Sequence, residues 1–249
     1  MFDSPFFQKF PQQPSCFIDD QGIEKRYVFP SFYEGSRGMT GFFSCSLSKA
    51  ALALPSPRLL PVPAGFGKAL LVVGAFEYNN PQGMDPYREI LFGLAVAQLK
   101  PGSLIPKPGL FIKRLIVDVP ENVQRGKHLW GMDKSMGEFK FFDEDEMRVC
   151  EVSRNGRPAL KLSLPRTGRS RRFEECNTLV TLKDGKVLRS RSCMSGRKIT
   201  AHCRGHIKLG ADPFAVELDA LGISLAPLWS RYLPNADIAM CLPSESMGL

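Results

Sequence analysis

One lysine in an apolar setting is the first candidate for chemistry in this sequence. Lys134 lies in the segment WGMDKSMG, residues 130–137, among a tryptophan, two methionines and two glycines. A lysine attacks a carbonyl carbon only as the neutral amine, and at the ordinary lysine pKa of about 10.4 only ~0.04% is neutral at pH 7. Full burial can lower a lysine pKa by ~3–5 units. Trp130, Met132 and Met136 could supply the dry environment, and the segment is therefore a candidate imine-forming site. The alternative is an ordinary solvated lysine on a turn.

A metal site is the second possibility, at TAHCRGHIK, and the spacing argues against it. On a strand, His202 and His206 share one face while Cys203 points to the other, so the three side chains cannot converge simply. No other pair of cysteines or histidines lies at zinc spacing. The GxSxG, Walker, GxGxxG and HExxH patterns are also missing from the sequence. We therefore expect no metal.

A nucleic-acid partner is suggested by the net charge of +8 and by the basic stretch PRTGRSRR at residues 165–172. Binding to phosphates requires such charge. These arginines are not accompanied by a recognition-helix pattern or by an aromatic stacking series. A solvated loop and the outer face of a hairpin explain them better, and we expect no nucleic-acid partner.

The cysteines and the apolar runs indicate the compartment. The cysteines are odd in number, scattered and never arranged as CxxC, at positions 16, 45, 150, 176, 193, 203 and 241. This pattern predicts free thiols in a reducing, cytoplasmic environment. The first residues, MFDSPFFQKFPQQPS, do not resemble a secretion signal. No stretch approaches the ~18 apolar residues of a membrane span, so we expect no membrane partner.

The elements that would hold Lys134 are mostly strands. β-rich runs occupy residues 69–78, 87–99, 110–119, 137–152 and 179–191. Asp184-Gly185 within the last run predicts a hairpin, because both turn positions need positive φ. Short helices are expected at 46–55, ended by Pro55, and at 213–223, with Asp212 as N-cap. The pattern predicts a mainly β fold, an antiparallel closed or nearly closed β-barrel with a few short helices.

The domain organisation is simple. Residues 1–25, rich in Phe, Pro and Gln, are interpreted as an N-terminal arm that docks on the rest of the chain. Residues 26–249 carry no internal repeat and no linker, so they are expected to form a single domain.

Several segments resemble the acetoacetate decarboxylase superfamily. GKHLWGMDKSMGEFKF (126–141) resembles the family's Schiff-base segment, a Gly-basic-x-x-Trp/Ser-Gly/Ala-x-Pro-Lys-Lys-Leu-Gly pattern, which places the reactive lysine on Lys134. PYREILFGLAV (86–96) resembles the preceding strand, whose glutamate faces that lysine, here Glu89. PSPRLLPVP (55–63) and the segments between 198 and 243 resemble other parts of the family, so that the similarity covers residues 26–243 in order.

The resemblance implies a barrel of the acetoacetate decarboxylase type that assembles as a homo-oligomer and needs no cofactor. It implies a small-molecule oxo-acid substrate and a lyase that decarboxylates a β-keto acid through an imine on Lys134. The resemblance makes Lys134 and Glu89 the catalytic residues. Trp130, Met132 and Ser135 would contact substrate, and Arg37 falls within a residue of the family's carboxylate-binding arginine.

The departures from the family pattern leave alternatives open. Ser135 stands where a second lysine is usual, so burial or another cation, such as Lys127 or Arg37, must keep the amine neutral. Asp133 replaces a common proline, and Gly74 stands where a second glutamate is expected. These changes fit aldol and dehydration chemistry on a 2-oxo acid, or a barrel that binds small molecules without catalysis.

Overall fold

The computed structural model describes residues 2–99 and 106–248. The helical elements are η1 (Phe7–Lys9), α1 (Leu47–Leu52), α2 (Pro120–Arg125), the π-helical turn η2 (Gly126–Trp130) and α3 (Pro213–Ala220). The strands are β1 (Gln13–Ile18), β2 (Glu24–Phe29), β3 (Ser31–Ser46), β4 (Leu59–Pro61), β5 (Lys68–Tyr78), β6 (Asn80–Pro81), β7 (Tyr87–Gln98), β8 (Lys107–Val117), β9 (Lys134–Met136), β10 (Glu138–Glu144), β11 (Met147–Arg154), β12 (Arg157–Pro165), β13 (Arg169–Lys183), β14 (Lys186–His202), β15 (His206–Leu209), β16 (Trp229–Met240) and β17 (Glu245–Gly248).

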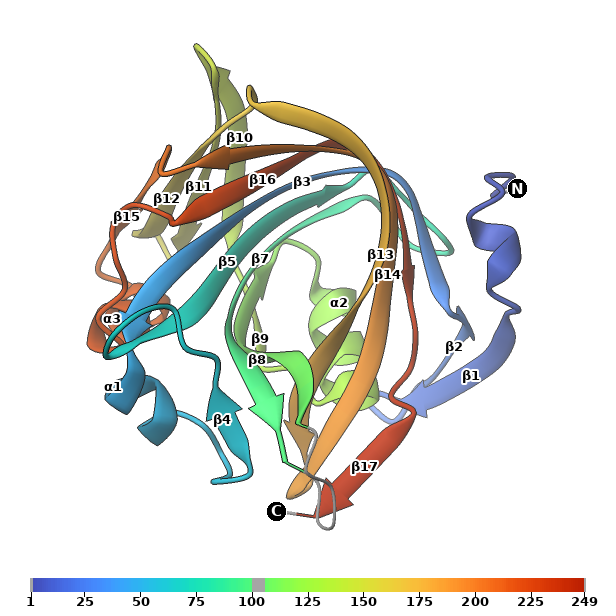
Figure 1. Ribbon diagram of the computed structural model, residues 1–249. Helices are drawn as coiled ribbons and strands as arrows, with labels where there is room; N and C mark the ends of the chain where they lie inside the picture. The colour runs from blue at the N-terminus through green and yellow to red at the C-terminus, as the bar shows by residue number, and fades with distance from the viewer. Residues whose placement is uncertain (1, 100–105, 249) are drawn as a thin grey trace.

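A closed ring of strands forms the centre of the molecule (Figure 1). The ring runs β7–β5–β3–β16–β14–β13–β8, and β8 returns to β7 to close it. The expectation of a mainly β barrel with few short helices is thereby confirmed. The expectation of a fully antiparallel barrel is wrong, because β13 and β8 run parallel, as do β8 and β9. An odd number of strands cannot alternate in direction all the way round a closed ring, so at least one neighbouring pair must be parallel.

The predicted turns and caps are largely confirmed. Asp184 and Gly185 both have positive φ and join β13 to β14. Asp212 caps α3 by accepting a hydrogen bond from the Phe214 amide. The run at 137–152 is two strands rather than one, because Asp145, at a φ of 51°, turns the chain between β10 and β11. Asp tolerates this left-handed conformation better than most residues.

Side-chain alternation along β5 separates two environments. Leu71, Val73 and Ala75 point outward into the main hydrophobic core. Val72 and Phe76 point inward and line the barrel interior. Side chains on a strand alternate between its two faces, so the same strand serves both. The barrel wall therefore has a packed outer face and a hollow inner face.

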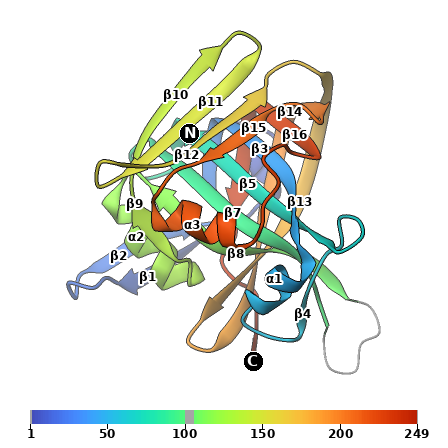
Figure 2. The same ribbon diagram turned by 90° about the vertical axis from the view of Figure 1, so that its left-hand side faces the viewer.

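A four-stranded sheet covers part of the outer face of the barrel (Figure 2). Its order is β10–β11–β12–β15, and α3 packs beside it. Cys150, Leu162 and Phe214 from this layer are buried in the same core as the outward side chains of β5 and β7. The main core thus lies between the barrel and the outer layer, which leaves the barrel interior free for a site.

A buried arginine joins the outer sheet to the barrel. The Arg148 guanidinium donates to Glu77 Oε1 at 2.5 Å and to Asp143 Oδ1 at 2.8 Å, and only 9% of its side chain is exposed. We expect Arg148→Met to lower the free energy of unfolding by about 1–3 kcal/mol, because it leaves the Glu77 carboxylate, whose side chain is 17% exposed, without its hydrogen-bond partner. Urea denaturation would measure the change. The control is Arg166→Met, since Arg166 pairs with Asp143 at the surface and its loss should cost about 1 kcal/mol or less.

The N-terminal segment packs against two parts of the barrel. Phe6 and Phe7 of the first segment are buried against Phe32, Cys193 and Ala239. The β1–β2 hairpin, which spans the predicted boundary at residue 25, lies next to η2.

Within that hairpin, Asp20 accepts hydrogen bonds from Lys127 of η2 at 2.8 and 2.9 Å. These bonds, with others from Gln124 and His128, lower the pKa of Asp20 to about 2. The hairpin therefore tethers the segment that leads to Lys134.

The expectation of seven free thiols is wrong for one pair. Cys176 and Cys193 form a disulfide between β13 and β14, where they are direct partners in register. Cys176 precedes the Asp184-Gly185 turn by the same number of residues as Cys193 follows it, and the two strands extend beyond the predicted 179–191 to bring the cysteines opposite each other. The other cysteines are unpaired. Within residues 2–99 and 106–248, no helix is long and apolar enough to cross a membrane.

Candidate active site

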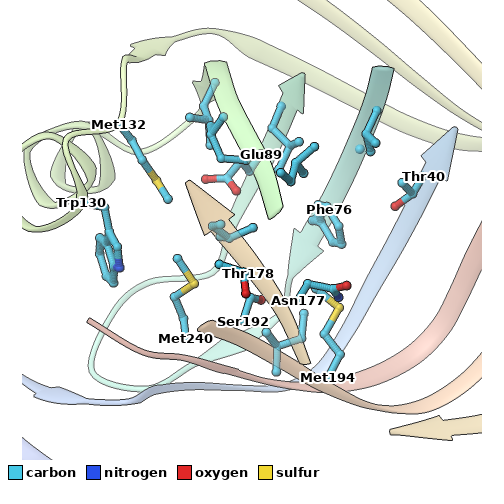
Figure 3. Close-up of a pocket in the computed structure, with 18 of the residues that line it drawn as sticks. Thr40, Phe76, Glu89, Trp130, Met132, Asn177, Thr178, Ser192, Met194 and Met240 are labelled. Carbon is cyan, nitrogen blue, oxygen red and sulfur yellow. The ribbon is translucent and has the colours of Figure 1, made fainter. Parts of the chain in front are cut away.

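The interior of the barrel is a cavity of about 430 Å³ (Figure 3). Its wall is formed by side chains of the barrel strands together with residues of α2, η2 and β9. Among the described lining residues the carboxylates are Glu89 and Glu175, and Glu175 is paired with Lys198 and Arg231 at 2.5 Å each. Glu89 is therefore the lining carboxylate that does not pair with Lys198 or Arg231.

Lys134 and Glu89 meet in this cavity. The Lys134 Nζ lies 2.6 Å from Glu89 Oε2, and the two side chains are only 8% and 7% exposed. Side chains alternate along β7, so Glu89 points into the cavity with Tyr87 and Leu91, while Ile90 points outward into the core. Lys134 reaches the site because β9 pairs with β8, with Lys134 opposite Leu115. Two elements far apart in sequence thus place an amine and a carboxylate in hydrogen-bond contact.

A glycine makes room for the lysine side chain. Gly126 begins η2, and a Cβ atom built on it would lie 2.5 Å from Lys134 Cε and 2.6 Å from Cδ. Gly126 has ordinary helical dihedrals, a φ of −61° and a ψ of −44°, so its backbone does not require glycine. Glycine is needed here because the lysine stem crosses the helix at van der Waals distance.

Three tyrosines surround the carboxylate. The ring centroids of Tyr33 and Tyr78 are 4.7 Å apart, and those of Tyr78 and Tyr87 are 4.6 Å apart. Burial, together with the nearby Glu89 charge, raises the pKa of Tyr78 well above its usual value. Burial and the Tyr33 and Glu89 charges do the same for the pKa of Tyr87. Tyr78 and Tyr87 therefore remain hydroxyl donors at the carboxylate end of the cavity.

The raised tyrosine pKa values predict an alkaline limit to stability. Burial also raises the pKa of Tyr27, so Tyr27, Tyr78 and Tyr87 keep their protons in the folded state. Unfolded tyrosines ionise near pH 10. Above that pH the unfolded state binds fewer protons than the folded state, so the free energy of unfolding falls as pH rises.

Phenolate absorbance at about pH 11 should report at most two of the five tyrosines in the folded protein and all five after urea unfolding. Full ionisation without loss of the folded state would contradict the burial of this cluster.

A buried guanidinium lies close to the reactive pair. Arg125 lines the cavity, is 2% exposed and directly precedes Gly126. It donates to the Tyr33 hydroxyl at 3.3 Å and to Ser31 Oγ. The rings of Tyr27, Phe29 and Trp130 lie 4.8, 5.2 and 5.4 Å from its guanidinium carbon. Its Nε has no hydrogen-bond partner among the described residues, so the wall holds a positive charge with a free donor.

The residues expected to contact substrate separate into two groups. Trp130 and Met132 line the cavity with 4% and 6% exposure, and the Trp130 indole is held by the Cys241 carbonyl at 2.9 Å. Ser135 does not line the cavity, and its hydroxyl donates to the Leu115 carbonyl at 3.3 Å. Arg37 is exposed and also lies outside the lining. Thr40 on the same strand does line the cavity, and Arg37, three residues away, points to the opposite face because side chains alternate along a strand.

The charged neighbours of Lys134 in sequence point elsewhere. Asp133 pairs with Arg114 on the outside, where 59% of the Asp133 side chain is exposed. Lys127 is occupied with Asp20 and is 58% exposed. Neither Lys127 nor Arg37 therefore stands in for the missing second lysine, and among the described lining residues the buried cation on the cavity wall is Arg125.

Sequence reasoning missed Arg125 and the tyrosine cluster. Pro120 at the start of α2 was the available signal, because proline favours the first turn of a helix. A helix that begins at Pro120 ends at Arg125, directly before the Schiff-base-like segment that begins at Gly126. The tyrosines come from three strands, and no local pattern in the sequence joins them.

Comparison with known proteins identifies the family of this chain and relates its fold to solved structures. The family model for acetoacetate decarboxylase (ADC) matches residues 21–180, and the chain belongs to that family. A solved acetoacetate decarboxylase has a TM-score of 0.64 and 14% identity, over 100% of this chain and 95% of the other. The enzyme from Legionella pneumophila subsp. pneumophila str. Philadelphia 1 has a TM-score of 0.65 and 12% identity, over 87% of each chain.

A third solved structure shows the same fold with a ligand. It is the enduracididine biosynthesis enzyme MppR complexed with the condensation product of pyruvate and imidazole 4-carboxaldehyde. The TM-score is 0.58 and the identity 17%, over 89% of this chain and 90% of the other. No curated protein matches the sequence. The family model establishes the family, and the solved structures establish the fold.

Proposed function

We propose that this protein is a cofactor-free carbon–carbon lyase that forms an imine between Lys134 and the carbonyl carbon of an oxo acid. The buried contact between Lys134 Nζ and Glu89 Oε2 at 2.6 Å is the observation that supports it. A lysine with no role in chemistry is usually solvated at the surface, whereas the Lys134 side chain is only 8% exposed. In the proposed mechanism the Lys134 ammonium passes its proton directly to the Glu89 carboxylate, which yields the neutral amine.

The proposed reaction begins with that proton transfer. The free amine attacks the ketone carbon, and a proton returned by Glu89 lets the oxygen leave as water, which gives a protonated imine. In a β-keto acid the bond to the carboxylate then breaks, carbon dioxide leaves, and its electron pair moves into the imine to form an enamine. Protonation of the enamine carbon and hydrolysis by one water release the ketone and regenerate the amine.

Arg125 is the cation that we assign to the substrate carboxylate, in place of Arg37. It is buried in the cavity wall, one residue from the glycine that the lysine stem crosses, and its Nε is unpartnered. Hydrogen bonds between a guanidinium and a carboxylate are strong in a buried site. Trp130 and Met132 would complete the binding surface.

Condensation is the second candidate reaction, and the structural likeness to MppR favours it. That enzyme is seen with pyruvate and with a condensation product of pyruvate and an aldehyde. For a 2-oxo acid, the imine on Lys134 would lose a proton from the adjacent carbon to Glu89, and the resulting enamine would attack the aldehyde carbon. Loss of water from that adduct and hydrolysis of the imine would then release the condensation product. Carbon dioxide release and condensation product, measured on the same substrate panel, distinguish the two reactions.

Borohydride trapping tests the proposal. Sodium borohydride added with acetoacetate, pyruvate or a longer oxo acid should reduce the imine and leave an adduct whose mass identifies the substrate. Peptide mapping should place it on Lys134. Lys127→Met, which removes a nearby exposed lysine, should leave the adduct unchanged. Binding without any adduct on Lys134 across the panel would instead support a non-catalytic barrel.

Assembly and location remain predictions from the family resemblance and the sequence. We expect a homo-oligomer, which light scattering coupled to size exclusion would measure. The cytoplasmic prediction rested on free thiols, and the Cys176–Cys193 disulfide removes part of that support.

A further inference from the structure

The cavity is much longer than the reactive pair requires. Its lining on β5 runs from Leu70 to Tyr78, about 26 Å at ~3.3 Å per residue. Barrel strands tilt by about 40°, which leaves roughly 20 Å along the barrel axis. The volume of about 430 Å³ lies in the range of pockets that hold drug-sized ligands. Acetoacetate or pyruvate would occupy a small part of this space.

The reactive groups occupy the half of the β5 and β7 lining between Gly74 and Tyr78, while the charged lining residues Glu175 and Arg231 are paired with each other. Tyr78 ends β5 and pairs with Tyr87 at the start of β7, close to Glu89. Lys134 joins at the level of Leu115, which is opposite Leu91. Arg125 and Gly126 approach from the same side as Lys134. Imine chemistry is therefore confined to this end.

The other end of these strands is apolar. Leu70 and Val72 of β5, Ala95 of β7, and Pro108 and Leu110 of β8 all line the cavity. The strand register brings them together, since Ala95 is opposite Leu110 and Leu71 is opposite Leu94. Water against such a wall is released favourably when an apolar chain replaces it. Polar lining residues border this wall: Asn177 and Thr178 come from β13, the neighbour of β8 in the ring, and Ser192 comes from β14 (Figure 3).

We infer that the substrate is an oxo acid with a long apolar chain, whose carbonyl end reaches Lys134 and whose chain lies along Val72, Ala95 and Leu110. The inference rests on the proposed imine chemistry and adds the substrate class. Each methylene that enters the apolar end should raise kcat/KM about four-fold, which corresponds to ~0.8 kcal/mol per buried CH₂.

A chain-length series tests the inference. Straight-chain β-keto and 2-oxo acids from four to twelve carbons are compared for kcat/KM and for the rate of borohydride trapping on Lys134. Ala95→Phe fills the apolar end, and Val72→Phe fills it from the neighbouring strand if the first variant fails to fold. The control is Leu60→Phe on β4, whose side chain is 43% exposed and outside the cavity lining.

The inference predicts a rise of at least 100-fold from the shortest to the best chain. Ala95→Phe or Val72→Phe should remove that gain, while Leu60→Phe should keep the full series and leave the four-carbon acid within about three-fold of wild type. Adducts on Lys134 with a flat or falling dependence on length would overturn the inference and leave the imine chemistry standing. Absence of adducts at every length would overturn the proposed function and the inference with it.

A binding measurement tests the position of the apolar chain without relying on catalysis. Calorimetry with dodecanoate, which lacks the ketone, should show binding to the wild-type protein, and Ala95→Phe should weaken it at least ten-fold. Equal binding to both proteins would overturn the placement of the chain along Ala95.

Discussion

Lys134→Met and Glu89→Gln are each expected to destabilise the protein, whereas the double variant should recover most of the loss. Each single change leaves one buried ionisable group without its partner, because the side chains of Lys134 and Glu89 are 8% and 7% exposed. Breaking a buried pair from one side costs about 3–5 kcal/mol, while replacing both members by neutral groups is often close to neutral. Urea denaturation of the four proteins would measure the coupling energy.

Activity should follow a different pattern in the same four proteins. Lys134→Met and the double variant should show neither turnover nor a trapped adduct, since the nucleophile is gone. Glu89→Gln keeps the amine but removes the proton acceptor, so we expect kcat to fall by about 10²–10⁴-fold. Recovery of stability without recovery of activity would separate the structural contribution of the pair from its chemical role.

A surface pair provides the control for this cycle. Lys9 and Glu174 are joined at 2.6 Å but are 53% and 49% exposed. Lys9→Met combined with Glu174→Gln should show a coupling energy of about 1 kcal/mol or less. If the Lys134–Glu89 coupling were no larger than this, the two groups would not be held as a buried ion pair and the proposed proton transfer would lose its basis.

Gly126→Ala should reduce kcat/KM by about 100-fold with little change in stability. The added methyl group would lie 2.5 Å from Lys134 Cε, so the amine must move away from its present position. A displacement of about 1 Å at a reacting group can cost 100-fold in rate. The helical dihedrals of Gly126 accept alanine, and alanine raises helix propensity by about 1 kcal/mol, which offsets part of the repacking.

Steady-state kinetics and thermal unfolding of Gly126→Ala would be compared with Lys127→Ala. Lys127 is the next residue of the same turn, and its side chain is 58% exposed, so its loss should leave the rate within about two-fold. A Gly126→Ala protein that works at the wild-type rate would show that the path of the lysine over η2 is not needed for catalysis.

Much of the fold follows from local sequence signals. The Asp184-Gly185 turn, the Asp212 cap and the strands at 69–78 and 87–99 are read from short-range patterns, and the structure confirms them. Such features depend on backbone dihedrals and side-chain alternation within a few residues. The disulfide between Cys176 and Cys193 was not predicted, although both cysteines lie on strands joined by the predicted turn and are partners in register.

The closure of the barrel and the composition of the site depend on long-range contacts. β13 and β8 run parallel after a long connection, which no turn signal specifies. Arg125 and the three tyrosines come from separate elements and become neighbours only when the ring closes. The family resemblance placed the carboxylate-binding arginine only to within one residue of Arg37. On β3 a shift of one residue decides whether a side chain faces the cavity or the solvent, and Arg37 is exposed.

The sequence by itself identified an unusual lysine, the strand that carries Glu89, and the family that both belong to. Those properties are local, or are preserved in the order of segments along the chain. Only the tertiary structure decided that Lys134 and Glu89 meet in a buried contact beside Arg125, and that the cavity continues beyond this pair along an apolar wall. The reason is that desolvation and cavity shape are set jointly by side chains from many strands, which meet only after the ring of strands has closed.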